Sequence, residues 1–157
     1  MRNQRLLPGQ TSAIVAEGAR SFLQHEGVPV DGVLNEVDEA AGSAVQVGGT
    51  VLVRIGRDRS TGGSYVVDGD DGSVGLVGVD LAESVYVNRS PHAFALSLTE
   101  FEVAVNSDEI ASGEPEDLER AAERFRARLM EIDPTALGEE TGFWGTLIFD
   151  LANGDYS

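Results

Sequence analysis

Valine and glycine are concentrated in the middle of this chain, and their distribution constrains the fold more than any other feature. Fifteen of the 18 valines lie between Val28 and Val87, and 12 of the 19 glycines lie between Gly27 and Gly78. β-Branched residues interrupted by glycine are typical of short strands joined by turns. The segments on either side have apolar residues at helical spacing. Helices before and after a run of strands predict an α+β fold, and 157 residues suit a single domain.

The valine-rich zone predicts several short strands. In residues 44–55, valine recurs with a spacing of two on either side of a pair of glycines, which predicts one bulged strand or two short ones. Residues 65–79 predict a hairpin, because an Asp-Gly pair supplies the positive φ that a tight turn needs. Residues 85–87 predict a further strand.

Four helices are expected outside this zone. The first begins at Thr11 or Ser12, either of which can cap a helix, and the second begins at Ser90, a cap followed by proline. The third ends at Asp133, because the residue before a proline avoids the helical region. Residues 1–10 are expected to form a loose tail. The predicted helices span residues 11–27, 91–105, 115–132 and 143–153.

The absence of two residue types restricts the chemistry. All eleven basic residues are arginines, and the chain has no lysine and no cysteine. This excludes a P-loop lysine, a Schiff-base lysine, a cysteine nucleophile, a disulfide and a thiolate zinc site. His25 and His92 are the only histidines, which leaves too few for a multi-histidine metal site. We therefore expect no catalytic residues, no metal site and no cofactor.

Two motifs could suggest catalysis, but each has a simpler interpretation. Ser90 and His92 could be a nucleophile and a base, yet no nucleophile-elbow motif surrounds the serine, and a capping hydroxyl is already hydrogen bonded. Glu114 and Glu116 could be an acid–base pair. They also stand where a helix N-terminus favours negative charge, and nothing in the sequence separates their pKa values.

The expected hairpin turn carries three aspartates that invite comparison with a calcium loop. Asp68 and Asp70 have the spacing of the first two ligands, but Val79 stands where an EF-hand loop needs its glutamate. A soluble hairpin tip explains these carboxylates better.

Arg54, Arg57 and Arg59 form the only basic cluster outside the predicted helices. Arginines beside a glycine-containing loop could hold a phosphate, so a small-molecule or nucleotide-binding domain is one alternative. The formal net charge of −16 opposes an anionic ligand, and a solvent-facing turn is the preferred interpretation.

Negative charge is concentrated in the C-terminal part of the chain. Residues 90–157 contain 15 acidic residues against four arginines, and residues 91–119 contain no arginine. A pI near 4.2 argues against a nucleic-acid partner and favours a cationic protein partner. A solvated acidic loop between two helices is the other interpretation. The candidate partner-binding residues lie in this loop and at the hairpin tip: Asp108, Glu109, Glu114, Glu116, Asp68, Asp70 and Asp71.

No targeting signal or membrane span is recognisable in the sequence. We therefore predict a cytoplasmic protein without a membrane partner. The use of arginine in place of lysine suggests a GC-rich bacterial genome.

Three segments follow one another in a particular order: Tyr-Val-Val-Asp-Gly-Asp-Asp-Gly-Ser-Val from residue 65, Val-Tyr-Val-Asn-Arg-Ser from residue 85, and the helix led by Phe94. In this order they resemble the SUKH superfamily of bacterial immunity proteins, and within it the fourth group. Leu-Gln-His-Glu-Gly-Val-Pro from residue 23, and Ile-Asp-Pro from residue 132 followed by Trp144, agree with the outer parts of the pattern. Arg89 departs from the serine usual at its position.

The resemblance implies an α+β domain with a mixed, twisted sheet flanked by helices, and no catalysis. It implies a protein that neutralises a cognate polymorphic toxin, often a nuclease or a nucleic-acid deaminase, by tight binding in the cytoplasm. A basic toxin face would suit the acidic charge of this chain. An acidic secretion-chaperone-like or scaffold protein is a second alternative, and the sequence leaves the oligomeric state open.

Overall fold

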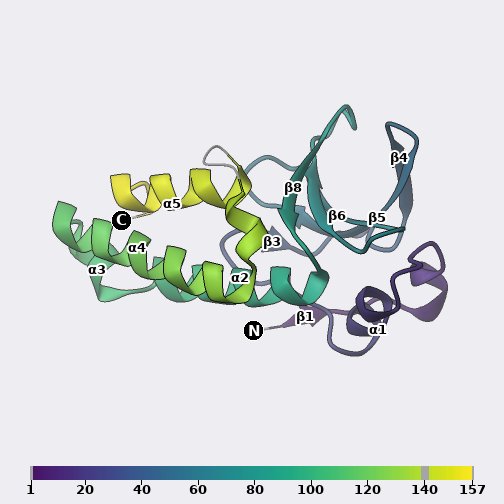
Figure 1. The fold of residues 1–157 in the computed structure, drawn as a ribbon, viewed down its shortest axis with the longest axis horizontal. Coiled ribbons are helices and arrows are strands. Elements are labelled where there is room, and N and C mark those ends of the chain that lie inside the picture. Colours follow the sequence, from purple (N-terminus) through teal and green to yellow (C-terminus); the bar gives the residue numbers. More distant parts are fainter. Residues whose placement is uncertain (1, 139–141, 157) are drawn as a thin grey trace.

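A curled antiparallel sheet and a group of helices make up the two parts of the fold (Figure 1). The structure is a computed structural model and describes residues 2–138 and 142–156. Its strands are β1 (Asn3–Gln4), β2 (Val28–Pro29), β3 (Asn35–Glu36), β4 (Ala44–Val47), β5 (Thr50–Asp58), β6 (Ser64–Asp68), β7 (Val74–Val77) and β8 (Ser84–Asn88). Its helices are α1 (Glu17–His25), α2 (Pro91–Val105), α3 (Asp108–Ser112), α4 (Pro115–Ile132) and α5 (Phe143–Asn153), with 3-10 turns η1 (Pro8–Thr11) and η2 (Pro134–Leu137).

The main sheet has the order β3-β5-β6-β7-β8, and β4 also pairs with β5. The α+β class is confirmed, but every strand pair in the described residues is antiparallel, whereas the resemblance implies a mixed sheet. Short turns join β4 to β8 in succession, and strands joined by short turns can pair only antiparallel. The two-strand alternative for residues 44–55 is the one observed, because Gly48 and Gly49 both have positive φ and form a turn.

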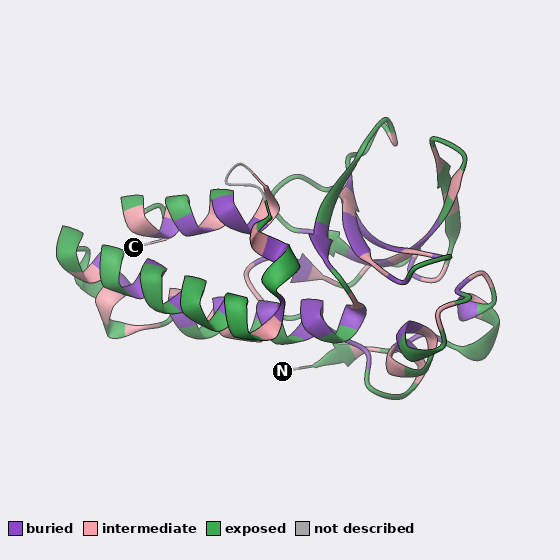
Figure 2. Ribbon diagram, viewed as in Figure 1, coloured by how far each residue is buried: buried purple, intermediate pink, exposed green. Residues whose placement is uncertain are grey.

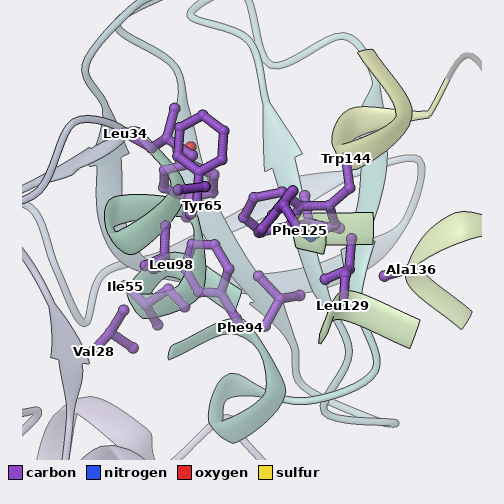
Figure 3. Close-up of a cluster of buried hydrophobic side chains, with 14 of the residues drawn as sticks. Val28, Leu34, Ile55, Tyr65, Phe94, Leu98, Phe125, Leu129, Ala136 and Trp144 are labelled. Carbon is purple, nitrogen blue, oxygen red and sulfur yellow. The ribbon is translucent and has the colours of Figure 1, made fainter. Parts of the chain in front are cut away.

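The sheet buries both of its faces, but against different neighbours. Val53 and Ile55 of β5 belong to the larger core, which the sheet shares with the helices. Ile55 and Tyr65 of β6 lie in this core beside Phe94 and Leu98 of the helical part (Figure 3). Leu52 and Val66 alternate with them and lie on the opposite face, inside the curl. The smaller cluster on that opposite face consists of Leu52, Val66 and Val77, with Val45, Val47 and Leu81 packed against it.

Helices α2, α4 and α5 enclose the larger core. Ser90 caps α2 as predicted, since its Oγ accepts a hydrogen bond from the backbone N–H of Ala93 at 3.1 Å. Phe101 of α2 packs against Phe125 of α4 and Trp144 of α5, with ring centroids 5.4 and 6.1 Å apart. The buried stripes of α4 and α5 turn inward, and their outer faces are exposed (Figure 2).

The N-terminal region differs from its prediction. The first helix begins at Glu17 rather than at Thr11 or Ser12, because the N–H of Val15 donates to the carbonyl of Gly69 at 2.7 Å and holds the preceding residues against the hairpin. The expected loose tail is also more ordered: β1 pairs with β2, and Leu6 is buried.

Candidate functional site

A buried polar cluster connects the segments that carry the family resemblance. The side-chain amide of Asn88, at the end of β8, donates to Ser97 Oγ of α2 at 3.2 Å and to Asp133 Oδ2 at 2.9 Å. Its oxygen accepts a hydrogen bond from Trp144 Nε1 of α5 at 3.0 Å. All four side chains are fully buried, so this cluster holds β8, α2, α4 and α5 together.

Asp133 is the charged member of this cluster. Its carboxylate accepts hydrogen bonds from the backbone N–H of Arg89 at 2.9 Å and from the hydroxyl of Thr135 at 2.6 Å. Burial alone would raise the pKa of Asp133, but the hydrogen bonds from Thr135, Arg89 and Asn88 outweigh burial and hold it below its ordinary value. A low pKa and a fully bonded carboxylate suit a structural anion rather than a general acid.

A second buried carboxylate, Asp58, is also fully engaged. It accepts hydrogen bonds from Tyr65 Oη at 3.0 Å and from the hydroxyls of Ser60 and Thr61. Burial, followed by the neighbouring Asp58 charge, raises the pKa of Tyr65, so the phenol stays protonated and donates. Asp58 and Tyr65 are both buried, and this group closes the turn between β5 and β6.

The three aspartates of the hairpin tip have different roles. Asp68 Oδ1 accepts hydrogen bonds from the backbone N–H groups of Asp70 and Asp71, and Asp71 Oδ1 accepts one from Ser73. Asp68 and Asp71 therefore shape the turn. Asp70 is exposed, and its carboxylate has no hydrogen bond or ion pair within residues 2–138 and 142–156.

The acidic segment between α2 and α4 is not the continuous loop that the sequence suggests. Residues 108–112 form the short helix α3, in which Ile110 is buried and Ser107 is the cap. Glu109 pairs with Arg124 of α4 at 2.7 Å. Asp108, Glu114 and Glu116 are exposed, and across the described part of the chain their carboxylates have no hydrogen-bond or ion-pair partner.

The two groups of candidate residues lie far apart. The hairpin tip contacts the segment before α1, through the hydrogen bond between Val15 and Gly69. Helices α1 and α3 stand at opposite ends of the long axis of the molecule (Figure 1). The structure therefore separates Asp68, Asp70 and Asp71 from Asp108, Glu109, Glu114 and Glu116.

The basic cluster is largely neutralised within the chain. Arg57 and Arg59 both pair with Glu36, at 2.6 and 3.2 Å, and Arg54 donates to Ser43 at 3.3 Å. Two of the three guanidinium groups thus already share the carboxylate of Glu36. Their pairing disfavours the phosphate-binding interpretation.

Comparison with protein-family models gives one decisive match. The model of the SUKH-4 immunity protein matches residues 6–150 of the 157-residue chain. The chain belongs to the SUKH-4 immunity protein family. Comparisons with curated proteins and with solved structures gave no match.

Membership of the SUKH-4 family agrees with the buried clusters described above. Part of the family resemblance rests on the strand ending in Asn88, the helix after it, Asp133-Pro134 and Trp144, and these are the segments that the Asn88 cluster joins. The buried residues of this cluster in the SUKH-4 protein thus act in folding and are not exposed to a partner.

Two further observations bear on the kind of site that this SUKH-4 protein can offer. Among the residues that the structure describes, no three His, Asp or Glu side chains gather where they could hold a metal ion. In the same residues, no helix has the length and apolar character needed to cross a lipid bilayer.

The ion pair between Glu109 and Arg124 predicts a measurable titration. The hydrogen bond from Arg124 holds the pKa of Glu109 at about 2. Because this pKa lies below the unfolded-state value of roughly 4.3, the pair stabilises the fold above that value, and its contribution is lost as the pH falls towards 2. In an Arg124→Gln variant, the Glu109 pKa is expected to rise towards the ordinary value, as an NMR titration of the side-chain carboxyl carbon would show.

The matched control is Arg120→Gln, which removes an arginine of the same helix that pairs instead with Asp117. It should leave the titration of Glu109 unchanged. A Glu109 pKa near 4 in the unaltered protein would contradict the ion pair.

Proposed function

We propose that this protein is an immunity protein that binds and neutralises a cognate toxin and catalyses no reaction. The observation that carries the proposal is the family match over residues 6–150. The buried carboxylates support it, because Asp58 and Asp133 are bonded on the inside of the fold and present no acid–base pair to a substrate.

We further propose that the toxin acts on nucleic acid, as a nuclease or deaminase, and that the immunity protein covers its basic active-site face. The net charge of −16 supports this, because a face that binds phosphates carries arginine and lysine. The free carboxylates of Asp108, Glu114 and Glu116 are the best placed to attract such a face. The hairpin tip contributes only Asp70 as an unpaired carboxylate, so we assign it the smaller part.

The deciding experiment is co-expression of this protein with the toxin domain encoded by the neighbouring gene. We expect the two proteins to co-purify as a stoichiometric complex and the toxin to lose its activity in the complex. Failure to form a complex at both low and moderate salt would contradict the immunity role. Such a failure, together with a stable homodimer by light scattering, would favour the scaffold alternative.

The electrostatic part has its own test, a variant combining Asp108→Asn, Glu114→Gln and Glu116→Gln. These side chains have no partner in the described chain, so their neutralisation should leave the fold intact. We expect association with the toxin domain to slow by roughly tenfold at low salt and to become less salt-dependent. Glu109 is left unchanged because its removal would free Arg124.

The control variant neutralises three exposed carboxylates elsewhere: Glu17, Glu39 and Glu83. It changes the net charge by the same amount. An equal slowing of association in both variants would mean that the total charge of the protein, and not the carboxylates at the starts of α3 and α4, sets the association rate. No slowing in either would remove the electrostatic part of the proposal.

A further inference from the structure

The outer surface between α4 and α5 contains a groove of about 510 Å³. Its walls include Ala122 and Glu119 of α4 and Gly145, Phe149 and Ala152 of α5. Three of the lining residues, Ala122, Gly145 and Ala152, have a small side chain or none. The side chain of Phe149 is 67% exposed, whereas Ile148 beside it is buried.

An exposed phenylalanine in a groove differs from the other exposed apolar residues of this chain. Phe149 is the only phenylalanine, tyrosine or tryptophan among the described residues that exposes more than half of its surface. Aromatic side chains set in pockets are typical anchors of protein interfaces. The groove also has a polar rim, formed by Glu119, Glu123, Arg126 and Thr146, as such interfaces do.

The charged side chains at this rim that have no ion-pair partner in the described residues are negative. Arg126 pairs with Glu123 at 3.6 Å, and Arg120 pairs with Asp117 at 2.8 Å. Glu119 lines the groove, and Glu116 lies one helical turn before it on the same side of α4. Neither has a hydrogen-bond or ion-pair partner in residues 2–138 and 142–156.

The groove adjoins the acidic end of the molecule. Its α4 wall begins at Glu119, within two turns of the helix start at Pro115, and α3 packs against α4 at that end (Figure 1). Glu116, one of the carboxylates that we assign to electrostatic attraction, therefore lies next to the α4 wall of the groove.

We propose that the α4–α5 groove is the anchoring site for the toxin, and that it receives a toxin segment with a basic side chain beside an apolar one. The apolar side chain packs against Phe149 and Ala152. The basic side chain pairs with Glu119 and Glu116. This inference rests on the proposed immunity function and names the surface that performs it.

A second copy of this chain fits the groove less well. In a two-fold symmetric dimer the same patch meets itself, so the unpaired carboxylates of Glu116 and Glu119 from both copies would be brought into one interface. Like charges brought together in an interface oppose association. A basic partner meets no such repulsion.

The test measures the affinity of the toxin domain from the neighbouring gene for Phe149→Ala and Glu119→Gln. We expect Phe149→Ala to raise the dissociation constant by roughly tenfold or more. We expect Glu119→Gln to raise it by a few-fold and to reduce its salt dependence. Hydrogen exchange of the unaltered complex should show new protection in α5 and in the first half of α4.

The matched controls are Leu7→Ala and Glu39→Gln, which remove a similarly exposed apolar side chain and an unpaired carboxylate from the opposite end of the molecule. Leu7 is 69% exposed, so its loss should matter as little to folding as the loss of Phe149. Both controls should bind the toxin domain as the unaltered protein does.

The outcomes separate this inference from the proposed function. If the unaltered protein binds the toxin domain and Phe149→Ala binds equally well, the groove assignment is wrong and the immunity role stands. If the unaltered protein does not bind, both are wrong. If Phe149→Ala instead abolishes self-association seen by light scattering, the groove is a dimer interface and the assignment to the toxin is overturned.

Discussion

Replacing Asn88 by alanine is expected to lower the free energy of unfolding by roughly 3 kcal/mol. The substitution removes the acceptor of Trp144 Nε1 and one donor to Asp133. The indole N–H is then left buried without a partner, and a buried unsatisfied donor costs about 1 to 3 kcal/mol. The lost charge-assisted bond to Asp133 adds to this cost.

Urea unfolding followed by far-ultraviolet circular dichroism measures the effect. Asn153→Ala is the control, because Asn153 is an exposed asparagine at the end of α5, and its replacement should change stability by less than about 0.5 kcal/mol. If Asn88→Ala does not fold, the milder Ser97→Ala, which removes one acceptor of the same amide, should still show a loss of about 1 kcal/mol. Stability equal to that of the unaltered protein would contradict the role of the cluster.

Truncation of Phe101 to alanine is expected to cost about 4 kcal/mol. The side chain is 1% exposed and meets Phe125, Trp144 and Tyr156. Removing it leaves a cavity at the place where α2, α4 and the C-terminal segment join, and rings on three sides limit how far the site can collapse.

Phe149→Ala is the matched control, since it makes the same substitution at a side chain that is 67% exposed. It should leave the unfolding midpoint almost unchanged, which would also validate its use in the binding test. Trp144 is the only tryptophan, and it packs against Phe101, so its fluorescence reports unfolding in both variants. A loss below about 1 kcal/mol for Phe101→Ala would mean that this junction is not a tightly packed core.

The sequence by itself determined the elements whose signals are local. The start of α2, both ends of α4 and the end of α5 follow from Ser90-Pro91, Pro115, Asp133-Pro134 and Gly154, because caps and prolines act within one turn of the helix that they begin or end. The hairpin of β6 and β7 follows from the Asp-Gly turn for the same reason. The family could also be named, because the order of these local segments is itself a sequence property.

Only the tertiary structure decided the features that depend on contacts between distant segments. Helix α1 begins at Glu17, later than the sequence predicts, because the backbone N–H of Val15 donates a hydrogen bond to the carbonyl of Gly69. Asn88 met Ser97, Asp133 and Trp144, which no local pattern connects.

The candidate partner-binding residues show the same division. Their charge was visible in the sequence, but spacing along the chain does not reveal which carboxylates already have a partner. The fold paired Glu109 with Arg124, used Asp68 and Asp71 in the turn, and placed the two acidic groups at opposite ends. The fold also placed Phe149 in a groove that Glu119 lines. The helical periodicity of α5 alone does not show which residues beside its buried stripe will contact a neighbouring helix. Helical periodicity reports that a face is buried, whereas the shape of the surface depends on how two helices pack.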